Sequence, residues 1–285
     1  AKIKEYLQKQ GITPESIKSI VISHAHQDHF KALPEFRKSF SNASVYVHQA
    51  DANVVYKQFK TQSSWKNALK LKGYSSFVIN LFEAIYFFFS PFYFRNISTL
   101  NHIDYTIKDG TIIGKDPQIK VIHTPGHTDG HICVLDSKGN FFIADMVPFT
   151  PWIEPNERSL NQILGSVDKI IDILKTKYTR VIRGHGDYRF DNWEINSPEF
   201  ELEKFEFFKD SIEEMLEKIP GFLKKPRRLE DIAQFINPNY NRYSKVMKLF
   251  FVPPAFTWAI SYCLKLESEG KIAHKKTPLY TIWSS

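Results

Sequence analysis

The chain contains, at residues 19–29, the stretch SIVISHAHQDH, in which a short apolar run leads directly into three histidines and an aspartate. An apolar run of this length is typical of a buried strand, so the polar residues after it are expected in a loop at the strand's carboxyl end. Three histidines and an aspartate within six residues are rarely placed together unless they bind metal. The stretch therefore predicts a strand that delivers the metal ligands His24, His26, Asp28 and His29.

Three other short apolar runs also lead to residues that bind metals. They are IKVIH (119–123), which leads through a Thr-Pro-Gly turn to His127; FFIA (141–144), which ends on Asp145; and RVIR (180–183), which leads to Gly184-His185-Gly186. A TPGH or GHG motif alone is more often a simple turn, but ligands in open α/β sheets bind outside the carboxyl ends of strands. We therefore expect the four loops to converge on one cleft.

Five histidines and two aspartates are too many for one tetrahedral ion but suit two. His24 and His26 alternate on a tight loop and are expected to face one ion, whereas Asp28 and His29 turn toward a neighbouring position. Asp145 has two carboxylate oxygens and can bridge the ions. Imidazole and carboxylate ligands suit zinc and also accept iron, manganese or cobalt. Such a centre supplies hydroxide at neutral pH, which predicts hydrolysis with Asp28 and Asp145 as catalytic carboxylates.

The elements HAHQDH, TPGHT, the strand end at Asp145 and GHG resemble the motifs of the metallo-beta-lactamase superfamily, and the similarity runs from His24 to about Asp187. The resemblance implies an α/β fold, the αββα sandwich, with a dinuclear centre. The two divalent ions are expected to be Zn²⁺, with iron or manganese as alternatives. The resemblance also implies a ligand set for each ion, namely His24, His26 and His127 for the first, Asp28, His29 and His185 for the second, and Asp145 as the bridge.

Three features depart from the family's usual pattern. Only 23 residues precede His24, so we expect that the family's N-terminal strands are missing from this chain, because a sheet without them would expose an unpaired edge. Phe30 and Lys31 replace the small residues that often follow the first motif. Ala144 replaces the glycine that usually precedes the bridging aspartate. Neither replacement removes a ligand.

Residues 1–195 alternate between apolar runs and helical patterns, which is typical of a layered α/β domain. The expected strands are 19–23, 44–48, 119–123, 131–135, 141–144 and 180–183, and the expected helices are 2–10, 33–40 and 159–175.

An apolar segment, Phe77–Phe94, lies within an expected helical insert at 53–101. It has 18 residues with Glu83 inside and Pro91 near its end, so it is short for a membrane span, and membrane contact is not expected. We expect the insert to cover the apolar part of a small-molecule substrate, with a homodimer interface as the alternative.

The composition shifts near Asn196, and residues 196–285 are expected to form a second module. Helical patterns cover 199–219, 226–236 and 256–272, and two short strands joined by a turn close the chain. Three helices and a strand pair suggest a winged helix, and they are similar to the tail of hydrolases in the lactamase-beta-like branch, some of which cleave single-stranded RNA.

Charge is concentrated in the same module. Residues 220–285 hold eleven basic and four acidic residues, a net charge of +7 that equals the net charge of the whole chain. Such a surface can attract RNA, although a solvated basic face gives the same count.

Length and composition exclude several classes of protein. With 285 residues, 42% of them hydrophobic and 24% charged, the chain is globular and neither disordered nor fibrous. Two cysteines cannot build a disulfide framework or a cysteine zinc knuckle. The first residues lack the apolar core of a secretory signal, which indicates a cytoplasmic protein, and the missing initiator methionine predicts that the true N-terminus lies upstream.

Three functions fit these features. The first is a metal-dependent hydrolase of an ester, thioester or lactone, with the insert as an apolar wall. The alternative is an endoribonuclease that uses the same metal centre and holds single-stranded RNA on the basic module. The third is a nucleic-acid-binding regulator with a sensory metal site, which the intact set of donors disfavours. Among the other histidines, His131 is either a support for a ligand or a strand residue, and the remainder are expected to be structural or surface groups: His48, His102, His123 and His274.

Overall fold

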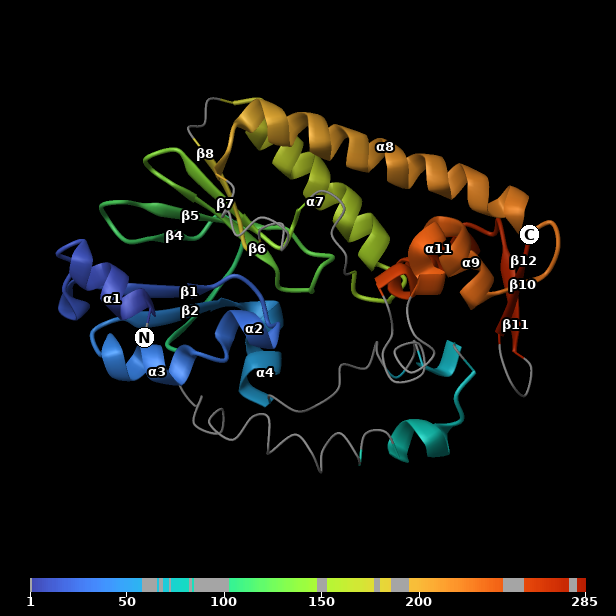
Figure 1. The fold of residues 1–285 in the computed structure, drawn as a ribbon, viewed down its shortest axis with the longest axis horizontal. Coiled ribbons are helices and arrows are strands. Elements are labelled where there is room, and N and C mark those ends of the chain that lie inside the picture. Colours follow the sequence, from blue (N-terminus) through green and yellow to red (C-terminus); the bar gives the residue numbers. More distant parts are fainter. Residues whose placement is uncertain are drawn as a thin grey trace.

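The computed structural model describes residues 2–57, 66, 69–71, 73–81, 84, 103–147, 153–176, 180–185, 195–242, 254–276 and 281–285. Within these residues the strands form three sheets, two of which lie face to face between layers of helices (Figure 1). Helices α1 and α3 lie on one side of this pair of sheets, and α7 and α8 lie on the other. The layer order is that of the expected αββα sandwich.

The first sheet is parallel and begins with the strand that precedes the histidine loop. Its strands pair in the order β1-β2-β3, with bounds β1 Ser19–Ile22, β2 Ser44–His48 and β3 Tyr105–Ile107. Four helices accompany it: α1 Lys2–Lys9, α2 Gln27–Phe30, α3 Leu33–Ser39 and α4 Gln49–Lys57. Val45 and Val47 of β2 pack with Phe30 and Leu33, so the helices that follow the histidine loop are fixed by their apolar side chains.

The second sheet is mixed, and helix α7, Ser159–Leu174, packs against it. Strands β4 to β7 run antiparallel, β8 is parallel to β7, and β9 is antiparallel to β8. The bounds are β4 Ile112–Ile113, β5 Ile119–His123, β6 Ile132–Asp136, β7 Asn140–Ala144, β8 Arg180–Arg183 and β9 Ile195–Asn196. Since β5, β7 and β8 run in one direction, the loops after them emerge at one edge.

The two sheets meet through apolar side chains and a backbone hydrogen bond. Ile107, Val121 and Ile132 are buried together, and Val21 of β1 packs against them. The Ile132 amide donates to the Ser23 carbonyl at 2.9 Å, which joins the start of β6 to the residue just before His24. The end of β1 is thereby held at the edge of the sandwich where the loops of the second sheet emerge.

The C-terminal region, residues 196–285, adds helices and a small antiparallel sheet in the order β10-β12-β11. Its elements are α8 Pro198–Phe222, β10 Arg227–Arg228, α9 Leu229–Ile236, the 3₁₀ helix η2 Pro238–Arg242, α11 Pro254–Ser268, β11 Ala273–Lys276 and β12 Thr281–Ser284. The expected closing strand pair is β11 and β12, whereas β10 was not expected. The winged-helix assignment stays a prediction.

The hydrophobic core continues across residue 196. Phe141 and Val181 of the second sheet belong to the same buried cluster as Phe205 of α8 and Trp283 of β12. Residues 196–285 therefore pack on the sheet domain and share its core, although the division of the chain at this point stays a prediction.

A buried ion pair crosses the same boundary. The Arg183 guanidinium at the end of β8 lies 2.7 Å from the Glu201 carboxylate of α8, whose side chain is fully buried. Helix α8 itself begins with a cap, because the Ser197 hydroxyl accepts a hydrogen bond from the Phe200 amide and Pro198 follows the cap directly.

The insert at 53–101 lies largely outside the described residues, and its predicted helical character and its position over the site stay untested. In the part of Phe77–Phe94 that the structure describes, Phe77 and Leu81 are exposed and Ile79 is buried. Among the described residues no helix is long and apolar enough to cross a lipid bilayer.

Candidate metal centre

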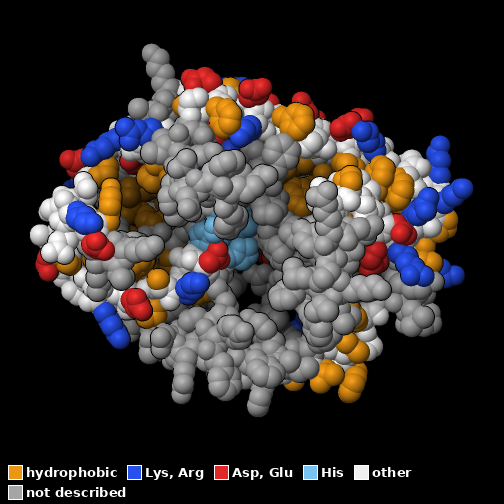
Figure 2. Space-filling view, in the orientation of Figure 1, with side chains coloured by type: hydrophobic (Ala, Val, Ile, Leu, Met, Phe, Trp, Pro, Cys, Tyr) orange, Lys and Arg blue, Asp and Glu red, His pale blue; other side chains and the backbone are white. Residues whose placement is uncertain are grey.

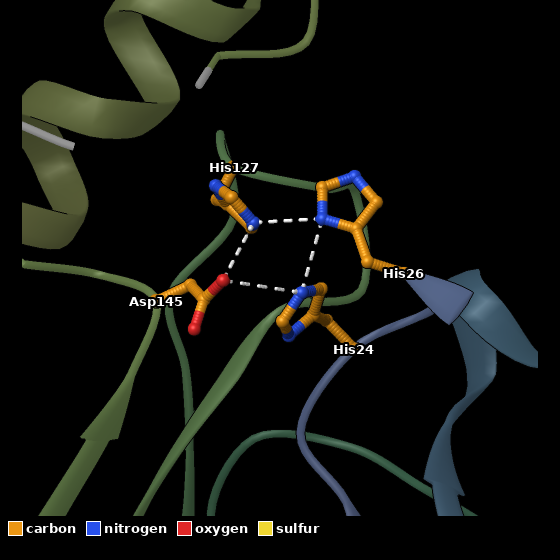
Figure 3. Close-up of side chains that lie close together, drawn as sticks. All are labelled: His24, His26, His127 and Asp145. Atoms are coloured by element: carbon orange, nitrogen blue, oxygen red, sulfur yellow. Dashed lines mark hydrogen bonds and ion pairs between the residues drawn. The ribbon is translucent and has the colours of Figure 1, made fainter. Parts of the chain in front are cut away.

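Four of the predicted ligands form a buried group, which consists of His24, His26, His127 and Asp145 (Figure 3). His26 Nδ1 lies 3.1 Å from His24 Nε2 and 2.9 Å from His127 Nε2. Asp145 Oδ2 lies 3.5 Å from His127 Nε2 and 3.7 Å from His24 Nε2. Residues more than 100 positions apart in the sequence thus point one ligand atom each toward a common point.

The other three predicted ligands form a more exposed group, which consists of Asp28, His29 and His185. His29 Nε2 lies 3.1 Å from His185 Nε2, and Asp28 Oδ2 lies 3.5 Å and 3.3 Å from these two nitrogens. The Asp28 side chain is 53% exposed and that of His185 is 36% exposed. Figure 2 shows histidine side chains in a hollow near the centre of one face of the molecule.

Asp145 lies between the two groups. Its Oδ2 atom is 3.4 Å from His29 Nε2 and 3.3 Å from His185 Nε2, while His24 and His127 of the buried group lie at similar distances. One carboxylate oxygen therefore faces ring nitrogens of both groups. The structure brings all seven predicted residues together, in the two sets that were expected for the two ions.

The buried group fits a metal ion on geometric grounds. Tetrahedral zinc with Zn–N bonds of about 2.0–2.1 Å separates its ligand atoms by roughly 3.3 Å, close to the spacing of the three imidazole nitrogens here. A neutral imidazole carries one N–H and one lone pair, so three ring nitrogens that face one point cannot all be satisfied by sharing protons. A cation at that point would satisfy all three lone pairs.

The electrostatics of the buried group also favour metal binding. Burial, followed by the neighbouring His131, His127, His26 and His29, lowers the pKa of His24 well below its usual value. Burial likewise lowers the pKa of His26. Both imidazoles are therefore neutral at neutral pH, which is the form that binds metal ions.

His29 of the exposed group shows the opposite pKa shift. Burial lowers the pKa of His29, but the hydrogen bond and charge of Asp145 and the charge of Asp28 outweigh it and raise the pKa. Burial raises the pKa of Asp145, but its hydrogen bond with His29 and the nearby imidazoles outweigh this and lower the pKa, so the carboxylate is ionised. An ionised carboxylate between two groups of imidazoles is suited to two cations.

Two glycines in the motifs are required by close packing. A Cβ atom at Gly126, whose φ is +125°, would lie 2.6 Å from an Ile163 side-chain carbon. A Cβ atom at Gly184 would lie 2.5 Å from Asp145 Oδ1. These contacts explain why glycine precedes both His127 and His185, because any larger residue would displace a loop that carries a predicted ligand.

The structure shows where two of the residues that depart from the family pattern, Phe30 and Ala144, lie. Phe30 is buried in the core of the first sheet, where it fixes the helix after the histidine loop. Ala144 has a φ of +47°, the left-handed region that favours glycine, and it follows a register shift between β7 and β8. The chain turns at this irregularity and presents Asp145 to the site.

His131 lies outside both groups and contacts the backbone of Asp145. Its Nε2 accepts a hydrogen bond from the Asp145 amide at 3.2 Å, and its Nδ1 lies 2.8 Å from the Thr124 hydroxyl. Burial, the main cause, and the charges of His26 and His29 lower its pKa to about 3, so the ring is neutral. Of the two roles weighed from the sequence, the structure favours the first.

His48, His123 and His274 lie outside the two groups. The rings of His48 and His123 stack with centroids 3.9 Å apart, and His274 pairs with Glu267 at 2.6 Å. His102 lies outside the described residues.

The sequence analysis did not identify Asp51, a buried residue at the start of α4. Its carboxylate accepts hydrogen bonds from the amides of Ala25 and Gly130 and from the Thr128 hydroxyl. A lone aspartate after a strand gave no signal, because its partners come from distant loops.

Comparisons with known proteins identify the family of the chain. The sequence profile of the metallo-beta-lactamase superfamily matches residues 1–194. A Bacillus subtilis protein named "Probable metallo-hydrolase YqgX" is 26% identical over 193 residues, which cover 65% of this chain and 74% of that protein. A Drosophila melanogaster "Beta-lactamase-like protein 2 homolog" is 28% identical over 172 residues, which cover 56% of this chain and 49% of that protein, so the chain spans about half of this relative.

A solved structure shares the fold over nearly the whole chain. The crystal structure of a metallo-beta-lactamase family protein from Thermus thermophilus matches with a TM-score of 0.67 at 18% identity, and the match covers 99% of this chain and 84% of that one. The match includes the C-terminal region as well as the sandwich.

Proposed function

Because this chain belongs to the metallo-beta-lactamase superfamily, we propose that it is a hydrolase that cleaves an ester, thioester or lactone with a pair of divalent cations, most suitably Zn²⁺. The observation that carries the proposal is the position of Asp145, whose Oδ2 atom lies within 3.7 Å of ring nitrogens in both groups. The shared fold alone would not identify the reaction, because many chemistries use it.

Each predicted ligand has a distinct task in this mechanism. His24, His26 and His127 would hold the first ion, Asp28, His29 and His185 would hold the second, and Asp145 would join them. When bound, the two ions lower the pKa of water and polarise the substrate carbonyl. Asp28, half exposed at the open side, would receive a proton and release it to solvent. Asp145 stays ionised and balances the charge between the groups.

The apolar segment Phe77–Phe94 is the reason to propose that the substrate has an apolar part. If residues 77–94 line the cleft, each methylene that the acyl chain buries contributes about 0.8 kcal/mol. Hydrolysis rates across an acyl series should then rise with chain length before they level off. A flat series would favour the alternative use of the insert as a homodimer interface.

The experiment that tests the proposal is elemental analysis of the purified full chain followed by turnover on thioester, lactone, ester, beta-lactam and RNA substrates, with and without a chelator. We expect bound metal and chelator-sensitive hydrolysis of at least one carbonyl substrate. His26→Ala should lower metal content and turnover together. Retained turnover after loss of the metal would refute the mechanism.

A second candidate, cleavage of single-stranded RNA at the same centre, is supported by the basic charge of the C-terminal region. Arg228 and Lys275 both pair with Ile282 of β12, so they lie on one face of the small sheet. Figure 2 shows Lys and Arg side chains at the edge of the molecule where this sheet lies.

RNA held by phosphate contacts would bind much more weakly as the salt concentration rises, whereas hydrolysis of a neutral ester would hardly respond. Because the core continues across residue 196, replacing Arg228 and Lys275 by Gln is a better test than deleting the module. Cleavage of RNA that falls in this variant while ester hydrolysis stays constant would favour the second candidate.

A further inference from the structure

We propose that Asp51 is a positioning residue of the buried group, which clamps together the two loops that carry His24, His26 and His127. The proposal rests on the proposed function, because positioning has a purpose only if these imidazoles bind an ion. Asp51 lies outside the motifs and contributes no ligand atom to either group.

Both carboxylate oxygens of Asp51 are used within the clamp. Oδ2 accepts from the Ala25 amide at 2.8 Å and from the Thr128 hydroxyl at 2.8 Å. Oδ1 accepts from the Gly130 amide at 2.8 Å. Asp51 is 2% exposed, and hydrogen bonds to a buried charged acceptor are stronger than those between neutral groups.

The partners of Asp51 are adjacent in sequence to the predicted ligands. Ala25 lies between His24 and His26, and Thr128 directly follows His127. The first loop leaves β1 of the first sheet, and the second leaves β5 of the second sheet, so the clamp joins loops from opposite halves of the sandwich. A shift of either loop would change the spacing of the three ring nitrogens.

The second loop has the backbone form that the clamp requires. A Cβ atom at Gly130 would lie 2.5 Å from Asp51 Cγ, so only glycine allows the loop to approach this closely. The other side of the loop is also held, because His123 Nε2 lies 2.9 Å from the Asp129 carbonyl and the Gln162 amide donates to the Asp129 carboxylate at 3.3 Å. The loop is thus fixed from two sides.

The contacts of the clamp lie next to the ligands of the buried group and further from those of the exposed group. In the described part of the chain, no hydrogen bond joins Asp51 to Asp28, His29 or His185. A role in positioning therefore predicts an unequal effect on the two ions, whereas a general role in folding predicts an equal one.

The test compares Asp51→Asn, Thr128→Val and Thr128→Ser with the wild-type chain. Asparagine keeps the volume of Asp51 but turns its NH₂ group toward one of the two backbone N–H donors, that of Ala25 or that of Gly130. Valine removes the Thr128 hydroxyl and keeps its shape, whereas serine keeps the hydroxyl and serves as the matched control. Each full-length, metal-free protein is titrated with Co²⁺ against a competing chelator, and thermal unfolding of the metal-free proteins is recorded in parallel.

We expect Asp51→Asn to weaken binding of the first ion by about 10–100-fold, the usual effect of removing support from a ligand. The second ion should be weakened clearly less, because Asp28 and His29 follow on the same loop but next to Phe30, which the core of the first sheet holds. Thr128→Val should show a smaller loss in the same ion, and Thr128→Ser should resemble the wild type. Wild-type affinities for both ions in Asp51→Asn and Thr128→Val, or equal losses at both ions, would overturn the proposal. If the wild type binds both ions but hydrolyses none of the substrates, the function fails while an unequal loss still supports the clamp.

Discussion

The buried and exposed groups of the centre use the same residue types in different surroundings. His24 is fully buried and His127 is 3% exposed, whereas the Asp28 side chain is 53% exposed and that of His185 is 36% exposed. The buried group is held by residues around it, such as Asp51 and His131.

This difference in exposure predicts different affinities for the two ions. Preformed, desolvated and neutral imidazoles lose little freedom when they bind an ion, so the buried group should bind the tighter one. The exposed group can exchange ligands with water and substrate, so its ion should be the more labile. Asp145 belongs to both, and its removal is therefore the severest test of the comparison.

Asp145→Ala should have the largest effect. It removes the oxygen that faces both groups, so both ions should bind more weakly or be lost. The rate of hydrolysis should then fall on the order of 10³-fold, which corresponds to a loss of about 4 kcal/mol of transition-state stabilisation. Metal content and turnover measured on the same sample check this, with Asp145→Asn as a control of equal volume. A variant that keeps one full equivalent of tightly bound metal would show that the groups are independent.

His127→Ala and His185→Ala form a matched pair that separates the groups. We expect His127→Ala to lower the affinity for the tight ion by more than about 100-fold, since a direct ligand counts for more than its supports. His185→Ala should retain one equivalent of metal and lose the labile one. Competition titrations with a chelator measure both affinities, and the reverse pattern would contradict the assignment of the tight site to the buried group.

His48 is buried like the first group but lies outside both clusters. Burial and, next, the neighbouring His123 lower its pKa to about 4 from 6.5. The unfolded chain takes up this proton near pH 6.5 and the folded chain only near pH 4, so the stability that His48 contributes at neutral pH is lost as the pH falls through this window.

The variant His48→Gln should lose less stability between pH 6.5 and pH 4 than the wild type, and its metal content should be unchanged. Denaturant unfolding of the metal-free protein at several pH values measures the slope. Loss of metal in this variant would mean that burial of any histidine, and not its place among the ligands, governs binding.

Ala144→Gly should have the smallest effect. Relief of the left-handed backbone at Ala144 is opposed by the greater freedom of glycine in the unfolded chain, which leaves a net gain of about 1 kcal/mol or less. Thermal unfolding checks this, with Ala25→Gly, at a buried alanine without positive φ, as the destabilised control. A loss of stability in Ala144→Gly would show that the turn before Asp145 is unstrained.

The sequence predicted the strands that end at the site and missed several of the shortest strands. The apolar runs of β1, β5 and β8 have bounds within one residue of those expected, because short buried strands bounded by polar residues leave a clear pattern. Strands β9 and β10 have two residues each, too few for any period, and they were not expected.

The same contrast holds for the site. All seven predicted donors come together because their motifs follow strand ends. Glycine is needed at positions 126 and 184 because a Cβ atom there would collide with neighbouring atoms. Asp51 could not be found, since its role depends on backbone amides that folding brings to it from two loops. Metal binding by the seven residues stays a prediction.

A metal titration of the wild-type chain tests the central claim most directly. The full-length protein is stripped of metal, titrated with Zn²⁺ and assayed for turnover at each step. We predict two equivalents per chain, the first bound much more tightly than the second, with hydrolysis appearing as the second site fills. Less than one equivalent bound, or hydrolysis that is complete in the metal-free protein, would contradict the account.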